Sequence, residues 1–255
     1  MTQTHDIRLP SGHHPDVDQD EEWFEVVAGG DRRRLRIHDY EQIFSIPGLY
    51  EQLIDGELRC RSPRTMATVL ATLLDSEGEQ MANLTVLDFA AGNGMMGEEL
   101  AARGVESLTG VDNIVEAADA AQRDRPGLYR HYVVADLTDM APDVRRRLED
   151  ERFNCLTLVA ALSFDEVPPR AFAEAFNLVS DGGWIAFNVK RDLLQDQDEG
   201  GIGELVTRMV QEGVMEQRAS VRYRHRLSVK GDPIYYVALM GRKRAQLPLD
   251  WIAGD

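Results

Sequence analysis

The chain has 255 residues, of which 43% are hydrophobic, and its formal net charge is −16. This length suits one large globular domain, and no apolar run reaches the roughly 18 residues that a membrane span needs. Binding to DNA or RNA depends on neutralising phosphates, so the negative charge argues against a nucleic-acid partner. Cys60 and Cys155 are the only cysteines. Because Cys155 lies in an apolar run, we expect no disulfide and a reducing, cytoplasmic location.

The first 21 residues are polar, and we expect a disordered acidic tail there. Two short apolar segments on either side of a Gly-Gly pair then predict a hairpin, and a helical region continues through Tyr40 and Tyr50. We interpret residues 22–61 as an N-terminal layer of hairpin and helix. Ser62, followed by a proline, has the pattern of a helix cap and predicts an amphipathic helix after it.

From residue 84 onwards, apolar strand-like segments alternate with helical ones. This alternation predicts a parallel sheet with helices on both faces. The expected strands are 84–89, 108–111, 132–135, 155–160 and 184–189. The helices expected between them are 95–102, 115–122, 144–148 and 170–179.

The pattern changes near the end of the chain. Residues 215–229 and 234–240 flank a Gly-Asp-Pro turn and predict a long antiparallel hairpin. The expected fold class is therefore α/β, a doubly wound, seven-stranded mixed sheet that finishes in an antiparallel hairpin. We assign this domain to residues 62–244 and expect a C-terminal tail over residues 245–255.

A glycine-rich loop follows the first strand of the alternating region. Asp88 lies at the end of that strand, and Gly92 and Gly94 allow the backbone to pass close beneath a ligand. Asp112 and Asp136 follow the next two strands. Ligands of such sheets bind beyond the carboxyl ends of the strands, so the three aspartates should face one crevice. Each aspartate alone is as readily a turn former or a helix cap, but their joint placement favours a cofactor site.

With this loop and these aspartates, residues 62–241 resemble the class I S-adenosylmethionine-dependent methyltransferases, which have a Rossmann-like fold. The resemblance implies that Asp88 helps to hold the methionyl part of the cofactor, Asp112 the ribose and Asp136 the adenine amino group. The sequence departs from the family at Ala90, where glycine is usual. It looks most similar to small-molecule enzymes of the ubiquinone/menaquinone type and to Williams–Beuren-region-like proteins. The expected cofactor-binding residues are Asp88, Ala90, Ala91, Gly92, Asn93, Gly94, Asp112, Asn113, Asp136, Leu137 and Ala160.

The segment after the fourth strand should border the pocket for the methyl acceptor. It lacks the motifs of amino methyltransferases that act on nucleobases and of cytosine-C5 enzymes. Asp165 is a candidate general base, as is Glu166, although such acids more often cap the following helix. The aromatic residues of the N-terminal layer could close over the site as a lid, but packing is their commoner role. The expected acceptor contacts are Tyr40, Tyr50, Leu162, Ser163 and Phe164.

Basic and metal-binding side chains give weaker indications. The histidines, among them His38, His131 and His225, lack the spacing of metal ligands, so we predict no metal site. The C-terminal hairpin is rich in arginine, although the chain as a whole is acidic. It is either a site for an anionic acceptor or an oligomer, or a sheet edge that charge protects from aggregation, and we prefer the second interpretation.

These features predict transfer of a methyl group from S-adenosylmethionine to a small-molecule acceptor, with S-adenosylhomocysteine as the product. We expect a monomer or homodimer that binds neither nucleic acid nor membrane. An NAD(P)-linked oxidoreductase is one alternative, because Gly92, Gly94 and Gly97 also spell G-x-G-x-x-G. It predicts an N-terminal strand that opens the fold and no terminal hairpin. A non-catalytic, cofactor-binding regulator is the other alternative, and an acceptor pocket sealed by bulky side chains would favour it.

Overall fold

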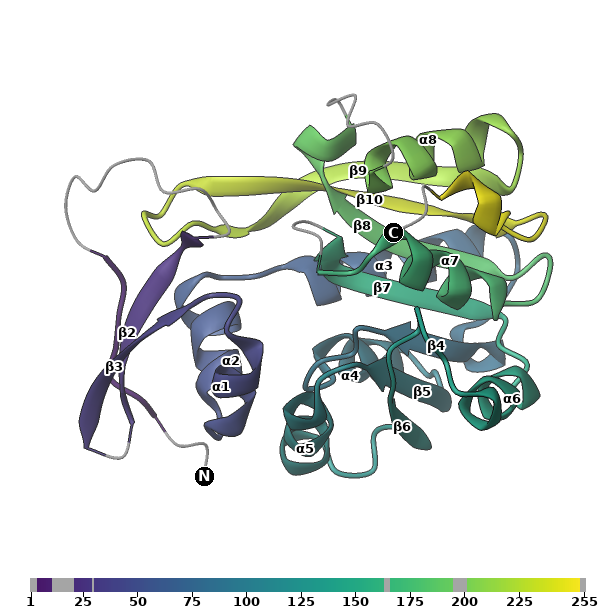
Figure 1. Ribbon diagram of the computed structural model, residues 1–255. Coiled ribbons are helices and arrows are strands. Elements are labelled where there is room, and N and C mark those ends of the chain that lie inside the picture. The colour runs from purple at the N-terminus through teal and green to yellow at the C-terminus, as the bar shows by residue number, and fades with distance from the viewer. Residues whose placement is uncertain (1–3, 11–20, 29, 163–165, 195–200, 253–255) are drawn as a thin grey trace.

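The computed structural model describes residues 4–10, 21–28, 30–162, 166–194 and 201–252. They form a three-stranded antiparallel sheet close to the N-terminus and a larger seven-stranded sheet (Figure 1). The strands of the larger sheet are β4 (Thr85–Phe89), β5 (Ser107–Asp112), β6 (His131–Val134), β7 (Cys155–Leu162), β8 (Trp184–Lys190), β9 (Met215–Leu227) and β10 (Pro233–Lys243).

The larger sheet has the strand order β6-β5-β4-β7-β8-β10-β9. Strands β4 to β8 run parallel to one another, and β10 pairs antiparallel with both β8 and β9. The predicted doubly wound mixed sheet with a terminal hairpin is therefore confirmed. The five expected parallel strands all form, with ends that differ from the predicted ones by two residues at most.

Helices cover both faces of this sheet because successive strand residues point to opposite sides. Val86 and Leu108 pack with α3 and α4, whereas Leu87 and Val111 share a core with α6, α7 and α8. We did not predict α8, although Leu205 in it begins a buried stripe with helical spacing. The helices are α3 (Ser62–Ser76), α4 (Met95–Ala101), α5 (Val115–Asp124), α6 (Pro142–Asp150), α7 (Pro169–Asn177) and α8 (Ile202–Gln211).

The N-terminal layer has a core of its own, built around Phe24, Leu35 and Leu53. Strand β1 pairs with β2, so this part of the first 21 residues is ordered, which differs from the disordered tail that we expected. The short strand was missed because two residues carry no readable periodicity. The elements of the layer are β1 (Ile7–Arg8), β2 (Trp23–Ala28), β3 (Asp31–Arg36), α1 (Tyr40–Ser45), α2 (Leu49–Glu51) and a π-helical turn (Gln52–Glu57).

The tip of the β9–β10 hairpin reaches across to the N-terminal layer (Figure 1). The Leu227 amide donates to the Leu58 carbonyl at 2.7 Å, and the Arg61 amide donates to the His225 carbonyl at 2.8 Å. Val229, just beyond β9, is buried in the core of the layer. The hairpin therefore holds the N-terminal layer against the open edge of the larger sheet's ligand crevice.

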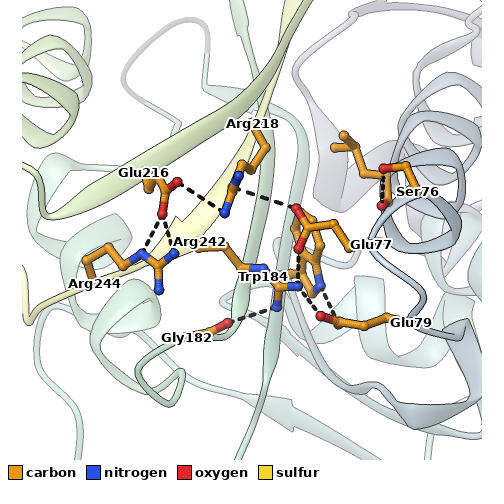
Figure 2. A network of polar contacts seen from close by, with 10 residues as sticks. Ser76, Glu77, Glu79, Gly182, Trp184, Glu216, Arg218, Arg242 and Arg244 are labelled. Atoms are coloured by element: carbon orange, nitrogen blue, oxygen red, sulfur yellow. Dashed lines mark hydrogen bonds and ion pairs between the residues drawn. The ribbon is translucent and has the colours of Figure 1, made fainter.

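The opposite end of the hairpin carries a network of ion pairs (Figure 2). Arg218 and Arg244 both pair with Glu216, and Arg242 pairs with Glu77 at 2.7 Å. Exposed pairs of this kind contribute little stability one by one, but they cancel the positive charge of this end. The arginine-rich hairpin is therefore not one continuous basic surface.

One local expectation is wrong. The Ser62 side chain makes no helix-capping bond, because its hydroxyl lies against Tyr223 and His225 inside the protein.

The described part of the expected C-terminal tail packs against the domain. Leu247 is buried, and the Asn177 side chain bonds both its amide and its carbonyl.

Candidate active site

The loop between β4 and α4 has an unusual backbone. Ala90, Gly92 and Gly94 adopt positive φ angles of 53°, 55° and 92°. Glycine adopts this conformation freely, whereas alanine is strained in it, and such strain concentrates at functional sites. A Cβ atom on Gly92 would lie 3.3 Å from the ring of Phe44, so a side chain here would press on the N-terminal layer above the loop.

Asp112 lies beside this loop at the end of β5 and is 6% exposed. One carboxylate oxygen accepts the Gly92 amide at 2.9 Å, and the other accepts the Ile114 amide at 3.1 Å. Burial raises the pKa of Asp112, and these backbone hydrogen bonds oppose the rise. Each oxygen retains a second lone pair, so the carboxylate can still accept two hydroxyl groups of a ligand.

Asp88 lies deeper, under the same loop, and is 1% exposed. Its two oxygens accept the hydroxyls of Thr157 and Tyr129, both at 2.7 Å. Burial raises the pKa of Asp88 to about 6, although these hydrogen bonds act in the other direction. These two hydrogen bonds hold the Asp88 carboxylate in place beside the cleft, where it contributes negative charge, and each oxygen keeps one further lone pair.

Asn93, within the loop, has a buried acceptor without a partner. Its amide nitrogen donates to Asp124 at 3.3 Å, which fixes the orientation of the side chain. The Asn93 Oδ1 atom is then buried and accepts no hydrogen bond. A buried acceptor without a donor costs about 1–3 kcal/mol, so this atom is suited to a donor that a ligand brings.

The third aspartate, Asp136, lies just beyond the end of β6 and is exposed. One of its oxygens accepts the amide and the hydroxyl of Thr138, which leaves the other oxygen for a ligand. Leu137 follows it with a buried side chain, and Asn113 and Ile114 complete this wall of a cavity. The three aspartates thus do lie along the carboxyl edge of neighbouring strands.

Two adjoining cavities occupy this edge of the sheet. The first contains Asp112 and Asp136. The second contains Asp88, Asn93 and His225. Since both are bordered by the same six residues, we treat them as two halves of one cleft. The shared residues are Tyr40, Tyr50, Ala90, Gly92, Val159 and Ala160.

The floor between the two halves is an irregularity in β7. Pairing of β7 with β8 is interrupted between Leu158 and Leu162, and Ala160 has a φ of 65°. The freed Ala160 amide donates to the Asn188 side chain at 2.7 Å. This bulge turns the backbone of Ala160 towards the cleft, where a regular strand would continue in the sheet.

The N-terminal layer forms the roof of the cleft. The Tyr40 hydroxyl donates to Glu166 at 3.0 Å, which joins the roof to the segment after β7. Phe44 and Tyr50 pack with ring centroids 4.7 Å apart, and Arg123 of α5 donates to the Phe44 carbonyl. The pKa of Tyr40 is raised by burial and by the neighbouring Glu166 carboxylate, so the phenol keeps its proton.

The structure brings most of the predicted site residues to this cleft. Leu162 is an exception, because its side chain is 1% exposed and belongs to the hydrophobic core. Gly94 lines neither half, and its positive φ serves the turn into α4. Ser163, Phe164 and Asp165 lie outside the described residues. The predicted residues that line the cleft are Tyr40, Tyr50, Asp88, Ala90, Ala91, Gly92, Asn93, Asp112, Asn113, Asp136, Leu137 and Ala160.

Other cleft residues were missed from the sequence. Phe44 and Ile114 line the first half of the cleft, and His225 and Tyr236 line the second half. Nothing in their local sequence marks them, because His225 and Tyr236 belong to a hairpin whose path to the cleft is set by tertiary contacts.

The described residues hold neither a membrane-spanning helix nor a metal-binding cluster. No helix in the described ranges is long and apolar enough to cross a membrane. Within those ranges there is also no group of three or more His, Cys, Asp or Glu side chains that could hold a metal ion.

Comparison with known proteins agrees with this geometry. Residues 87–187 match the family described as a methyltransferase domain. The chain is 29% identical over 139 residues to the mitochondrial ubiquinone biosynthesis O-methyltransferase of Candida albicans. That alignment covers 52% of this chain and 40% of the relative, so the chain spans well under half the length of that protein.

Solved structures share the fold at low sequence identity. The N-methyltransferase NodS from Bradyrhizobium japonicum, in complex with S-adenosylhomocysteine, has a TM-score of 0.55 at 16% identity. The similarity covers 81% of this chain and 97% of that one. A putative RNA methyltransferase from Pyrococcus horikoshii has a TM-score of 0.53 at 15% identity and covers 72% and 86% of the two chains.

Proposed function

The chain contains a class I S-adenosylmethionine-dependent methyltransferase domain, and from this premise we propose that it transfers a methyl group to a small-molecule acceptor. The observation that carries the proposal is the cleft of two joined halves beneath the N-terminal layer. One half has the polar groups that a nucleoside needs. Both halves lie under the roof that contains Tyr40 and Tyr50, and an enclosed cleft of this kind suits a small acceptor better than a macromolecule.

In the first half, the residues fit the adenosine part of the cofactor. Asp112 has lone pairs left for two ribose hydroxyls, and Asp136 has an oxygen left for an amino group. Gly92 keeps the backbone close without a side chain in the way. We assign the backbone amide of Leu137 to the adenine ring, as the family resemblance implies.

In the second half, we assign Asn93 to the methionyl amino group. Its buried, unpartnered Oδ1 is the acceptor that an ammonium group would fill. Asp88 lines the same half and adds negative charge beside this group, and each of its oxygens keeps a lone pair beyond the bonds from Thr157 and Tyr129. The direct contact that the family resemblance implies for Asp88 stays part of this proposal.

The bound cofactor supplies a methyl group on a positively charged sulfur, which is already activated for transfer. The protein then has to orient the acceptor and exclude water. The N-terminal layer does both if it closes as a lid, with Tyr40 and Tyr50 facing the cleft. Glu166 remains a candidate base for an acceptor that must lose a proton, because it lines the cleft beside Tyr40.

The alternatives fit less well. An NAD(P)-linked enzyme was expected to lack a terminal antiparallel hairpin, whereas β9 and β10 form one. A regulator without chemistry was expected to have a sealed acceptor pocket, whereas the second half of the cleft is open space. The net charge of −16 supports a reaction without nucleic acid, and the free Cys60 and Cys155 fit the cytoplasmic setting that we propose. A monomer or homodimer that binds no membrane remains part of the proposal.

A calorimetric titration tests the proposal. S-adenosylhomocysteine should bind, and NAD should not. The labelled methyl group of S-adenosylmethionine should then appear on a member of a panel of small phenols, carboxylic acids and amines. Binding of NAD alone would refute the cofactor assignment, and cofactor binding without transfer to any member would favour the regulator.

A further inference from the structure

A buried chain of polar side chains leads from the β7 bulge to the far wall of the second half-cleft. It joins Asn188 on β8, Ser62 at the start of α3, and Tyr223 and His225 on β9. Asn188 and Ser62 have no exposed surface, and His225 is 6% exposed. These elements are far apart in the sequence, so their meeting at one cavity is a property of the fold.

The direction of the hydrogen bonds between these four side chains follows from one backbone donor. The Ala160 amide can only donate, so the Asn188 oxygen faces it at 2.7 Å. The Asn188 amide nitrogen must then point the other way, where it donates to Ser62 Oγ at 3.2 Å and to the Tyr223 hydroxyl. The orientation of the Asn188 side chain is therefore determined by the backbone.

The two hydroxyl protons then have one consistent arrangement. Tyr223 has one described acceptor for its proton, Ser62 Oγ at 2.7 Å. Ser62 must therefore give its own proton to His225 Nδ1, which is also 2.7 Å away. With the directions reversed, the Tyr223 proton would have no acceptor among the described residues. Nδ1 of His225 is thus an acceptor.

A neutral imidazole with an accepting Nδ1 carries its proton on Nε2. Burial and the adjacent Arg226 guanidinium hold the pKa of His225 well below its usual value, so the ring is neutral. No described residue accepts a hydrogen bond from Nε2. The ring borders the second half-cleft and stacks on Tyr236 with centroids 4.1 Å apart, which fixes its plane.

We propose that His225 binds the methyl acceptor by donating a hydrogen bond from Nε2–H to a carboxylate oxygen, so that the substrate is a small carboxylic acid. This inference rests on the proposed function, because it names the class of molecule that the second half-cleft receives. His225 is a binding and specificity residue in this scheme, since a nitrogen that already carries a proton cannot take one from the acceptor.

Arginines without an ion pair line the approach to the second half-cleft. This half-cleft adjoins an outer cavity, with which it shares Cys60, Pro63 and Met95. The wall of the outer cavity has as many acidic side chains as arginines, but in the described part of the chain Arg59, Arg61 and Arg224 have no ion pair, and of the acids only Asp55 has none. The Nε atom of Arg224 is also buried without a hydrogen-bond partner. A carboxylate that entered here would therefore pass arginines that have no carboxylate partner.

The other charges near His225 do not compete for this role. Arg226 is held in a buried pair with Glu22 at 2.7 Å, and both side chains are 4% exposed. The other two arginines of the outer wall are also paired. Arg64 pairs with Glu99, and Arg125 pairs with both Glu51 and Glu98. Asp88 also lines the half-cleft, and its oxygens accept the hydroxyls of Thr157 and Tyr129.

The experiment is a long-range ¹H–¹⁵N correlation spectrum of the full chain with bound S-adenosylhomocysteine. It should show His225 protonated on Nε2 and not on Nδ1. Benzoate, benzamide and benzylammonium are then added in turn, because they share a ring and differ in the polar group. Benzoate should shift the Nε2 signal at the lowest concentration and benzamide at a higher one, whereas benzylammonium should not shift it.

Two variants complete the test. His225→Gln places an amide N–H near the position of Nε2 and should keep benzoate binding, whereas His225→Phe should weaken it by about tenfold, the loss expected for one charge-assisted hydrogen bond. The affinity for S-adenosylhomocysteine should be unchanged in both.

Four results would each overturn the proposal. In the spectrum they are protonation of His225 on Nδ1, equal responses to benzoate and benzylammonium, and no response to benzoate. In the variants, the fourth is an unchanged benzoate affinity of His225→Phe. Failure of the wild-type protein to bind S-adenosylhomocysteine would instead overturn the proposed function, and the proton on His225 could still be read in the free protein.

Discussion

Replacing Asp112 with alanine should weaken S-adenosylhomocysteine binding by about 2 kcal/mol or more, which is roughly thirtyfold in Kd. Each oxygen of the Asp112 carboxylate holds one backbone amide and has one lone pair left for a ribose hydroxyl. Hydrogen bonds to a charged group contribute about 1.5–3 kcal/mol each, and part of this is lost to competing water. Two such bonds would contribute about 3 kcal/mol at the lower end, and the loss to water reduces the expected minimum to about 2 kcal/mol.

The same substitution also frees the Gly92 amide, so binding must be separated from loop damage. Calorimetry would compare wild type and Asp112→Ala with S-adenosylhomocysteine and with its 2′,3′-dideoxy analogue. If Asp112 holds the ribose, removal of the hydroxyls should weaken binding to wild type and should cost little further in the variant. Asp119→Ala is the matched control, because Asp119 is an exposed acid on nearby α5 that lines neither half of the cleft. Equal losses for the analogue in both proteins would refute the ribose assignment.

Three further predictions concern the loop and its roof. Ala90→Gly should raise the free energy of unfolding by about 1 kcal/mol in chemical denaturation, because it relieves a left-handed alanine, whereas the neighbouring Ala91→Gly should lower it. The folded-state pKa of Asp88 is about 6 and lies above its unfolded value, so the cofactor-free protein should lose about 3 kcal/mol of stability as pH rises from about 4 to about 6. Asp88→Asn should abolish that loss in urea titrations at each pH. Residues 22–61 should exchange their amide hydrogens faster than the larger sheet in the free protein and slow down when cofactor and acceptor bind; full protection without ligand would show a rigid layer and no lid.

The larger sheet could be predicted because its signals are local. Each parallel strand is a short apolar run, and each following helix has its own spacing of apolar residues. The positions of Asp88, Asp112 and Asp136 at strand ends then determined which edge of the sheet would hold the cleft. For the same reason, the two-residue strand β1 and the interruption of β7 at Ala160 were missed, since neither has a periodic pattern of its own.

The chemistry inside the cleft depended on contacts that no local pattern contains. Asp88 was correctly placed at the end of its strand, but the sequence could not show that Thr157 and Tyr129 occupy its oxygens. Ser62 has the pattern of a cap, and its burial beside His225 reverses that interpretation. His225 itself was dismissed as a metal ligand and given no role, because residue 225 enters the cleft only through the reach of the hairpin.

The contact between the β9–β10 hairpin and the N-terminal layer also determines the order in which the nascent chain can fold. The side chain of Glu22 accepts the backbone amide of Val229, across 207 positions of sequence, and Val229 is buried in the same core as Phe24. Domains generally fold from the N-terminus as the chain leaves the ribosome. Here the first layer to emerge must wait, with part of its apolar core uncovered, until residue 229 has been made. The roof over the cleft is thus among the last parts to form, and a nascent chain that already has β4 to β8 still lacks the wall that carries His225.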